Sequence, residues 1–403
     1  MVNFYKVFLE RYFYAVHKSK YSYYDEFRTA SSGRASLIYK LEVTISLIER
    51  AFKFLTKKYI TQDEYSLIMV NKNNYFIQHI EELEGTYLLF TDDYSREKYL
   101  DYIVFKSVAS FKSRLPFDSE NLKKQLKSSS NLIVDHKLML YDLNKIGYNI
   151  KFIGSEKGIV LDFILEQYAY NQLVKVETDD VVIDCGGATG DTALYFYGKG
   201  AKKVYVYEFL PSSLKVINQQ LLNNGITQDK VEVIQKAIWD KSDQELSYLD
   251  RGNASIVDKK GKYSDSIMTL TIDDMVIKKE LNRVDFIKMD IEGAEVVALN
   301  GAYKCIQKHK PKLAISVYHK NDDLITIPTL IKKMNPNYQL YFDYYTNTGA
   351  EAILYAIDKG QLVKKYIIYT PGFDSTNGGS IAMHRLCDLL NSNGYEAFIW
   401  QGD

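Results

Sequence analysis

Hydrophobic residues recur at helical spacing through the first 150 residues of the chain. Leucine, isoleucine, valine and aromatic residues three and four positions apart are typical of helices with a buried face. Segments with this pattern are 4–18, 36–59, 61–70 and 95–111. Residues 118–131 (DSENLKKQLKSSSN) are polar and charged, and we expect them to form a connector. The pattern therefore predicts a mostly helical region over residues 1–150.

From about residue 151 the pattern alternates between short apolar runs and helical segments. The segment after the second run begins at Pro211 and is followed by Gly225, residues favoured at the start and just past the end of a helix. Such alternation predicts a doubly wound α/β domain with a parallel sheet. The apolar runs lie at 181–185, 203–208, 230–238, 284–290 and 312–319.

Residues 338–357 alternate on both sides of the turn TNTG and predict an antiparallel hairpin. A parallel, Rossmann-like sheet that ends in such a hairpin is typical of class I methyltransferases. We therefore predict three parts: a mostly helical N-terminal region (1–150), a methyltransferase-like α/β domain (151–360) and a C-terminal segment (361–403).

The amino-acid composition and net charge indicate which kinds of binding partner are expected. The chain has 403 residues, 46% of them hydrophobic, and its Lys+Arg and Asp+Glu counts are both 51. This is ordinary for a globular protein that buries a core. A net charge of zero argues against a broad nucleic-acid-binding surface, which would need an excess of basic residues. We expect no nucleic-acid partner.

The cysteine and hydropathy patterns predict a cytoplasmic protein. Cys185, Cys305 and Cys387 lie far apart, so neither a disulfide framework nor a cysteine zinc site is expected. No signal peptide opens the chain, and no run of 18 apolar residues is long enough to span a bilayer. The basic, aromatic segment 4–18 leaves peripheral contact with the inner face of the cytoplasmic membrane open. Self-association is open as well.

The stretch VVIDCGGATGDTALYF (181–196) has the pattern of a nucleotide-binding turn: a strand, a glycine-rich turn and a helix. The dinucleotide fingerprint G-x-G-x-x-G fits poorly, because Cys185 stands where the first glycine is required. S-adenosylmethionine has no pyrophosphate and needs fewer close backbone contacts at the helix start. Asp184, at the tip of the strand, is then expected to face its ammonium group directly or through water.

Three strand ends supply the predicted cofactor site. Glu208 ends the second strand, where a carboxylate accepts hydrogen bonds from both ribose hydroxyls. Ala237 ends the third strand, beside the expected adenine. An acid at the position of Glu208 also occurs in NAD enzymes and does not discriminate by itself. The predicted cofactor-binding residues are Asp184, Gly186, Gly187, Gly190, Glu208, Ala237 and Asp290.

A second constellation follows the fourth strand. FIKMDIEGAEVVAL (286–299) places Asp290 at the strand end and Glu292 and Glu295 at the start of the next helix. Ligands of open α/β sheets bind outside the carboxyl ends of the strands. The helix dipole alone would account for the two glutamates, but it accounts less well for Asp290.

In order along the chain, VVIDCGGATGDTALYF, VYVYE, TLTIDDM, VDFIKMDIEGAEVVALNGA and KPKLAISVYHKNDDLITIP resemble the FkbM family of S-adenosylmethionine-dependent methyltransferases. The resemblance runs from about residue 158 to 357, and DIEGAE is its most specific part. It differs at Gly187, where family loops often have alanine. The resemblance implies methyl transfer to a hydroxyl oxygen of a sugar or another natural product.

The predicted catalytic residues are His319, Asp290 and Glu292. An alcohol that accepts a methyl group must lose its proton as the new bond forms. Neutral imidazole accepts a proton near neutral pH, so His319, after the fifth strand, is the first candidate base. Asp290 is the alternative, as base or as the residue that orients the acceptor. No HxH or DxD cluster supports a metal, and we expect none.

The tail KYIIYTPGFDSTNGGSIAMHRLCDLLNSNGYEAFIWQGD (365–403) predicts a strand, a glycine-rich loop, a helix and a strand. It resembles the first βαβ unit of a GT-B glycosyltransferase. We expect either the beginning of a glycosyltransferase domain or an extension packed on the methyltransferase. A glycosyltransferase in the same chain implies a glycan acceptor, such as a bacterial surface polysaccharide.

Two other classes of function are weighed. A nucleotide-dependent oxidoreductase is disfavoured by Cys185, by the DIEGAE segment and by the terminal hairpin. A scaffold that keeps the methyltransferase fold without its chemistry is disfavoured by four intact residues of the predicted cofactor site, Asp184, Gly186, Gly190 and Glu208.

Overall fold

A computed structural model describes residues 4, 7–8, 11–12, 75–108, 115–116, 118–250, 256–258, 263, 265–362, 365–370, 378–392 and 396–401. The helices predicted over 36–59 and 61–70 lie outside these residues, as does most of the one predicted over 4–18. Within the described part of the chain, no helix is both long and apolar enough to cross a membrane.

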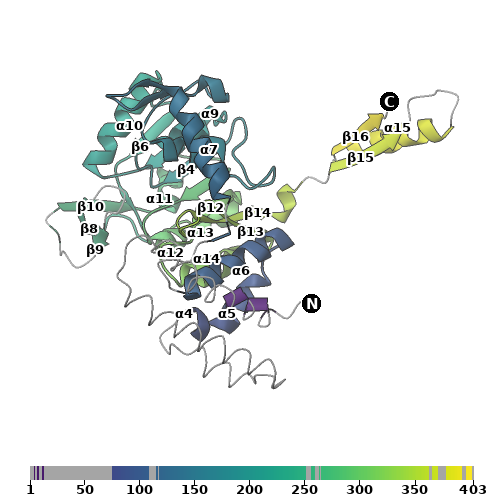
Figure 1. Cartoon of the computed structure of the whole chain (residues 1–403), viewed down its shortest axis with the longest axis horizontal. Helices are drawn as coiled ribbons and strands as arrows, with labels where there is room; N and C mark the ends of the chain where they lie inside the picture. The colour runs from purple at the N-terminus through teal and green to yellow at the C-terminus, as the bar shows by residue number, and fades with distance from the viewer. Residues whose placement is uncertain are drawn as a thin grey trace, which may run out of the picture.

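A seven-stranded sheet forms the centre of the protein, in the order β13-β14-β12-β11-β4-β5-β6 (Figure 1). Six strands run in the same direction, and only β14 is reversed, antiparallel to both of its neighbours. The strands are β4 (Val181–Cys185), β5 (Lys203–Tyr207), β6 (Val231–Ile234), β11 (Phe286–Met289), β12 (Lys312–Ser316), β13 (Tyr338–Tyr344) and β14 (Ala352–Asp358).

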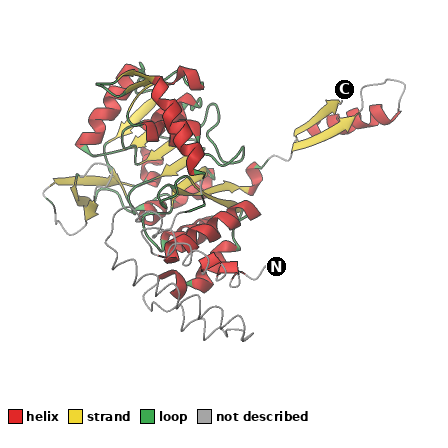
Figure 2. Cartoon of the chain, viewed as in Figure 1, coloured by secondary structure: helices red, strands yellow, loops and turns green. Residues whose placement is uncertain are grey.

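Helices cover both faces of this sheet (Figure 2), which explains why all residues of β4, β11 and β12 are buried. The predicted helix after residue 210 is α10, with Pro211 in its first turn. The helix predicted after residue 294 is divided at Gly301 into α12 and α13. The helices of this part are α9 (Asp191–Gly198), α10 (Pro211–Asn223), α11 (Ile272–Lys278), α12 (Glu295–Asn300), α13 (Tyr303–His309) and α14 (Asp323–Met334).

The third predicted strand, 230–238, is in fact two strands in two sheets. β6 ends at Ile234, and β7 (Ala237–Ile238) pairs in parallel with β10 (Asp265–Leu270). A smaller sheet has the order β7-β10-β8-β9, with β8 (Glu245–Leu249) and β9 (Ile256–Asp258). The break turns the chain across the carboxyl end of β6 and brings Ala237 to the rim of the central sheet.

Helix α6 (Asp93–Val108) confirms the helix predicted from residue 95 and lies against β13. The Asp92 carboxylate accepts a hydrogen bond from the backbone N–H of Ser95 at 2.8 Å and so caps the helix. The backbone N–H of Thr91 donates to the carbonyl of Leu340, which extends the outer edge of the sheet. The preceding helices are α4 (Tyr75–Gln78) and α5 (Ile80–Tyr87).

The expected connector at 118–131 is wrong: residues 119–129 form helix α7 (Ser119–Ser129), capped by Asp118, whose carboxylate accepts from Asn121 N. Its lysines, its leucines and its one glutamine are good helix formers, and charge alone does not indicate a loop. Residues 133–150, expected to be helical, instead form part of a small antiparallel sheet that continues to residue 153. Its elements are β1 (Ile133–Asp135), β2 (Leu140–Asp142) and β3 (Lys151–Ile153), with short helical turns η1 (Ser130–Leu132) and η2 (Leu143–Ile146).

The domain boundary predicted near residue 150 does not separate two hydrophobic cores, because buried residues from both sides of it pack together. Leu83, Phe90 and Tyr99 share one hydrophobic core with Ile287 and Leu313 of the central sheet. The division into three domains stays a prediction.

The C-terminal segment forms the predicted strand, helix and strand. β15 (Lys365–Thr370) and β16 (Glu396–Gln401) pair in parallel, and α15 (Gly378–Ser392) packs against both, apart from the rest of the molecule (Figure 1). A short turn, η4 (Lys359–Gln361), precedes this unit.

Candidate functional site

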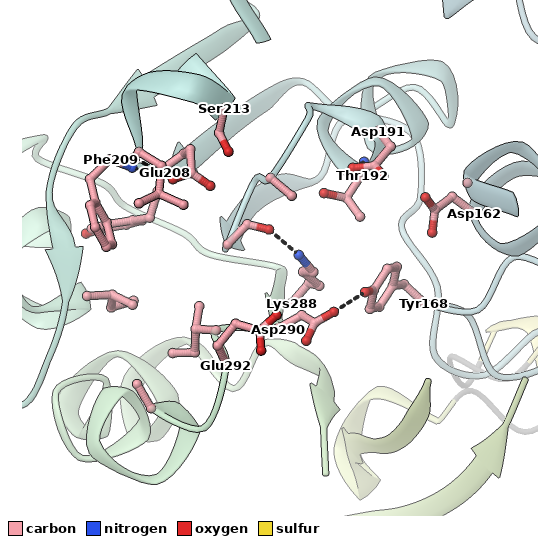
Figure 3. Close-up of a pocket in the computed structure, with 18 of the residues that line it drawn as sticks. Asp162, Tyr168, Asp191, Thr192, Glu208, Phe209, Ser213, Lys288, Asp290 and Glu292 are labelled. Carbon is pink, nitrogen blue, oxygen red and sulfur yellow. Dashed lines mark hydrogen bonds between the residues drawn. The ribbon is translucent and has the colours of Figure 1, made fainter. Parts of the chain in front are cut away.

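A cavity of about 420 Å³ opens at the carboxyl ends of the central strands, between β4 and β11, where the sheet order reverses direction (Figure 3). Ligands of doubly wound sheets bind at this position. Of the predicted residues, Gly186, Glu208, Ala237, Asp290 and Glu292 line the cavity. Asp184, Gly187, Gly190 and His319 are not among its lining residues.

One end of the cavity combines a fixed carboxylate with apolar groups. The Glu208 Oε1 atom accepts hydrogen bonds from the backbone N–H groups of Phe209 (2.7 Å) and Leu210 (2.8 Å). Burial raises the pKa of Glu208, and these backbone groups counteract the shift. Ile238 and Trp239 line the same cavity. This end offers an acceptor and flat apolar walls, as a ribose and an adenine require.

The glycine turn brings its backbone against the DIEG segment. Gly186 has φ +87°, and a Cβ there would overlap the carbonyl oxygen of Asp290. Glycine is therefore required by conformation and by space. Gly187 and Gly190 lie behind the cavity wall, and a Cβ on Gly187 would overlap Val206.

Asp184 is sequestered beneath the cavity. It is fully buried, its Oδ2 accepts from the Thr192 hydroxyl at 2.6 Å, and its Oδ1 lies 3.1 Å from Lys288 Nζ. Lys288 also donates to the carbonyl of Gly186 at 2.6 Å. Burial alone would lower the pKa of Lys288, but the charges of Asp184 and Asp290 raise it. Asp184 thus holds Lys288 of β11 in position, and Lys288 in turn binds the glycine turn through the Gly186 carbonyl.

Two tyrosines orient Asp290. The hydroxyl of Tyr168 donates to Oδ2 and that of Tyr318 donates to Oδ1, each at 3.1 Å. Figure 3 shows the first of these bonds, with Asp290 near the centre of the cavity and Glu292 beside it. The Asp290 carboxylate is held in one position while it faces the cavity.

His319 lies directly behind Asp290. Its Nδ1 is 3.0 Å from Glu295 Oε1, and its Nε2 is 3.4 Å from Asp290 Oδ1 and 3.7 Å from Glu292 Oε2. Burial alone would lower the pKa of His319, but the contact with Glu295 and the three carboxylates raise it to about 9. The imidazole is therefore mainly protonated at neutral pH.

Asp290, Glu295 and His319 also bring possible metal ligands within 4.8 Å of one another. Glu295 Oε1 already accepts from the backbone N–H of Ile291 at 2.9 Å. A protonated imidazole between carboxylates accounts for the same geometry without an ion. Our expectation that the protein binds no metal stays a prediction.

Several residues that line the cavity or lie beside it were not predicted from the sequence. Lys288 sits inside an apolar strand and would be taken for an exposed position, and Asp162, Gln167 and Tyr168 precede β4 in no recognisable motif. The chain reaches the cavity there through α8 (Glu156–Gly158) and the wide helical turn η3 (Ile159–Ile164). The hydrogen bond from Leu165 N to the carbonyl of Val160, five residues back, marks this turn.

The strand order, the glycine turn and the cavity at the reversal point define the fold of class I S-adenosylmethionine-dependent methyltransferases, as predicted. Residues 184–339 match the model of the methyltransferase FkbM domain. This stretch therefore matches the family that the motifs of the chain resemble, and the match supports S-adenosylmethionine as the cofactor. None of the curated proteins matches the chain.

Three solved structures illustrate what this chain is similar to. Methyltransferase FkbM from Methylobacillus flagellatus is 21% identical over 70% of this chain and 59% of its own, with a TM-score of 0.46. An rRNA methylase from Streptococcus thermophilus is 14% identical over 46% and 89%, with a TM-score of 0.31. Fibrillarin from Aeropyrum pernix, solved with S-adenosyl-L-methionine, is 9% identical over 48% and 72%, with a TM-score of 0.31. Because the match spans 59% of the first of these chains, the substrates and partners of the whole protein stay proposals.

Proposed function

We propose that this protein is a cytoplasmic S-adenosylmethionine-dependent O-methyltransferase. The observation that carries the proposal is the Asp290 carboxylate, held by two tyrosine hydroxyls on the wall of a cavity whose other end suits an adenosine. When bound, S-adenosylmethionine supplies an electrophilic methyl group. The protein then has to align an acceptor oxygen and receive its proton.

The residues fit this donor better than a dinucleotide. In dinucleotide-binding folds the pyrophosphate lies against the N-terminus of the first helix. Here Asp191 occupies the first turn of α9 and lines the cavity, close to Asp162 in Figure 3. Two carboxylates at that place would repel a pyrophosphate. This argues against the oxidoreductase alternative, because a dinucleotide would need its pyrophosphate to bind at this helix start.

Asp290 is the better placed of the two candidate bases. It lines the cavity, whereas His319 lies behind it and carries its own proton at neutral pH. A carboxylate is a weak base, but the hydroxyl proton becomes acidic as the oxygen bonds to carbon, so a weak base suffices. His319 then holds Asp290 in place and offsets the negative charge of the three carboxylates. Glu292, half exposed at the rim, is suited to a second hydroxyl of the acceptor.

The acceptor we propose is a sugar in a bacterial surface glycan. Support comes from the βαβ unit at 365–401, which has the element order expected at the start of a GT-B glycosyltransferase domain. One face of its two-stranded sheet is apolar and exposed, as expected of a unit that further elements cover. Methylation and sugar transfer would then occur in one polypeptide.

The test is transfer of labelled methyl groups from S-adenosylmethionine to oligosaccharides of bacterial surface polymers. We expect label on a sugar hydroxyl with the wild type and about 100-fold slower transfer with Asp290→Asn. The His319→Ala variant should lose less, because its role is indirect. Label found only on non-sugar acceptors would contradict the glycan assignment, and cofactor binding without any transfer would favour the scaffold.

A further inference from the structure

We propose that Asp162 and Gln167, together with Asp191, bind the ammonium group of the methionyl part of the donor, the role expected of Asp184. This proposal rests on the function proposed above. It assigns the acidic end of the cavity, formed by these three residues, to a primary ammonium ion.

Asp162 and Gln167 form a buried pair of acceptors on the cavity wall. Asp162 is 3% exposed and Gln167 4% exposed, and both line the cavity. The Gln167 amide N–H donates to Asp162 Oδ1 at 2.7 Å. This bond fixes the orientation of the amide, and the Gln167 Oε1 atom has no hydrogen-bond partner within the described part of the chain. A buried acceptor without a donor is costly, so a donor from a ligand is expected here.

The charges around Asp162 favour a cation. Asp191, on the first turn of α9, and Glu351, in the turn before β14, line the same cavity. Burial and the charge of Asp191 raise the pKa of Asp162 well above its usual range. The nearby cations already have partners, because Lys288 pairs with Asp184 and Lys157 lies 3.1 Å from Glu351. Lys288 still lowers the pKa of Asp162 and of Asp191. Because both lysines are already paired with other carboxylates, the acidic end keeps an excess of carboxyl groups among the described residues.

The position of this end matches the length of the donor. In Figure 3, Asp162 and Asp191 lie on the opposite side of the cavity from Glu208 and Phe209, with Lys288 and Asp290 between them. An adenosine placed at Glu208 directs its sulfur toward Asp290 and its amino-acid group toward Asp162. Asp184 cannot take this role, since both of its oxygens are already engaged by Thr192 and Lys288 below the cavity wall.

Comparing two ligands distinguishes the contribution of the ammonium contact to affinity from that of the rest of the site. S-adenosylhomocysteine carries the amino-acid group, whereas 5′-methylthioadenosine has the same adenosine and sulfur without it. By calorimetry at pH 7.5, we expect Asp162→Asn to weaken S-adenosylhomocysteine binding about 10- to 100-fold, the range of a charged hydrogen bond. Binding of 5′-methylthioadenosine should change less than about twofold, and this also reports that the variant is folded.

Glu166→Gln is the matched control, because Glu166 lies in the same segment but lines a different cavity, where it pairs with Lys199. It should bind both ligands like the wild type. Gln167→Met provides a second variant, expected to weaken S-adenosylhomocysteine selectively. Equal loss of both ligands in Asp162→Asn, or no loss of either, would overturn the proposal. Failure of the wild type to bind either ligand would instead overturn the proposed function.

Discussion

At the scale of single residues, the proposed site uses His319 as a cation rather than as a base, because nearby carboxylates raise its pKa to about 9. Sequence reasoning identified His319 and Asp290 but ranked them by side-chain type. We now rank Asp290 before His319 as the candidate base, because Glu295 is fully buried and its Oε1 lies 3.0 Å from His319 Nδ1. In the sequence, Glu295 is recognisable only as an acidic residue at the start of a helix. Distances between residues that are far apart in sequence decide protonation, and a single sequence does not contain them.

The first prediction concerns stability against pH. The pKa of His319 is raised to about 9 in the folded protein, against about 6.5 in an unfolded chain. The stabilisation is therefore fully present below pH 6.5 and is lost as the pH rises through 9. We expect the wild type to lose up to about 3 kcal/mol more unfolding free energy than His319→Gln between pH 6.5 and 10.

Urea unfolding of both proteins across this pH range measures the difference in unfolding free energy. Other groups that titrate in alkali contribute equally to both proteins, so their contributions cancel in this difference. Parallel curves for the two proteins would show that His319 is neutral in the folded state. An NMR titration of the imidazole resonance gives the pKa directly, and Glu295→Gln should lower it.

At the scale of elements, two loops face each other across the cavity wall. The glycine turn after β4 and the segment after β11 both contain non-glycine residues with positive φ, Ala188 (+41°) and Glu292 (+55°). Such strained positions cluster at functional sites. The sequence predicted both loops and the strands before them, because glycine and apolar patterns are local. It missed the division of 230–238, which depends on strand pairing with residues far along the chain. It also missed helix α7, because the charged residues of this segment suggest a connector although they are good helix formers.

Gly186→Ala tests the contact between these loops. The added Cβ overlaps the Asp290 carbonyl and φ is +87°, so the loops must separate. We expect S-adenosylhomocysteine to bind at least about tenfold more weakly and stability to fall by about 2–4 kcal/mol. Gly225→Ala is the control: its φ is +61°, but nothing lies within 4 Å of the added Cβ. It should lose about 1 kcal/mol and keep its affinity. Equal affinity in both variants would show that the contact is dispensable.

At the scale of the whole molecule, the C-terminal unit and the methyltransferase part differ in how they bury their apolar residues. Cross-strand partners Ile367 and Phe398, and Tyr369 and Trp400, are 53–70% exposed on one face of the β15–β16 sheet. Helix α15 covers the other face. The sequence predicted these elements, but whether a sheet face has a cover depends on what packs beside it.

Deletion of residues 363–403 should leave S-adenosylhomocysteine affinity unchanged within about twofold, because none of the described residues of this unit lines the cavity. Fluorescence of the apolar dye ANS should fall, since the exposed face is lost. The full-length variant Phe398→Ser/Trp400→Ser should show the same fall in dye binding. Weaker ligand binding after the deletion would show that the unit supports the cavity.

Helix α6 has a practical consequence for how the protein can be shortened. The segment before it pairs with the outer edge of β13, and Tyr99 and Tyr102 of the helix pack edge-on against Phe342. A recombinant fragment trimmed to the stretch that matches the FkbM domain would expose this strand edge and its aromatic side chains. Exposed edges pair with one another and aggregate. The smallest soluble version of this enzyme must therefore begin before Phe90, well upstream of its first recognisable motif.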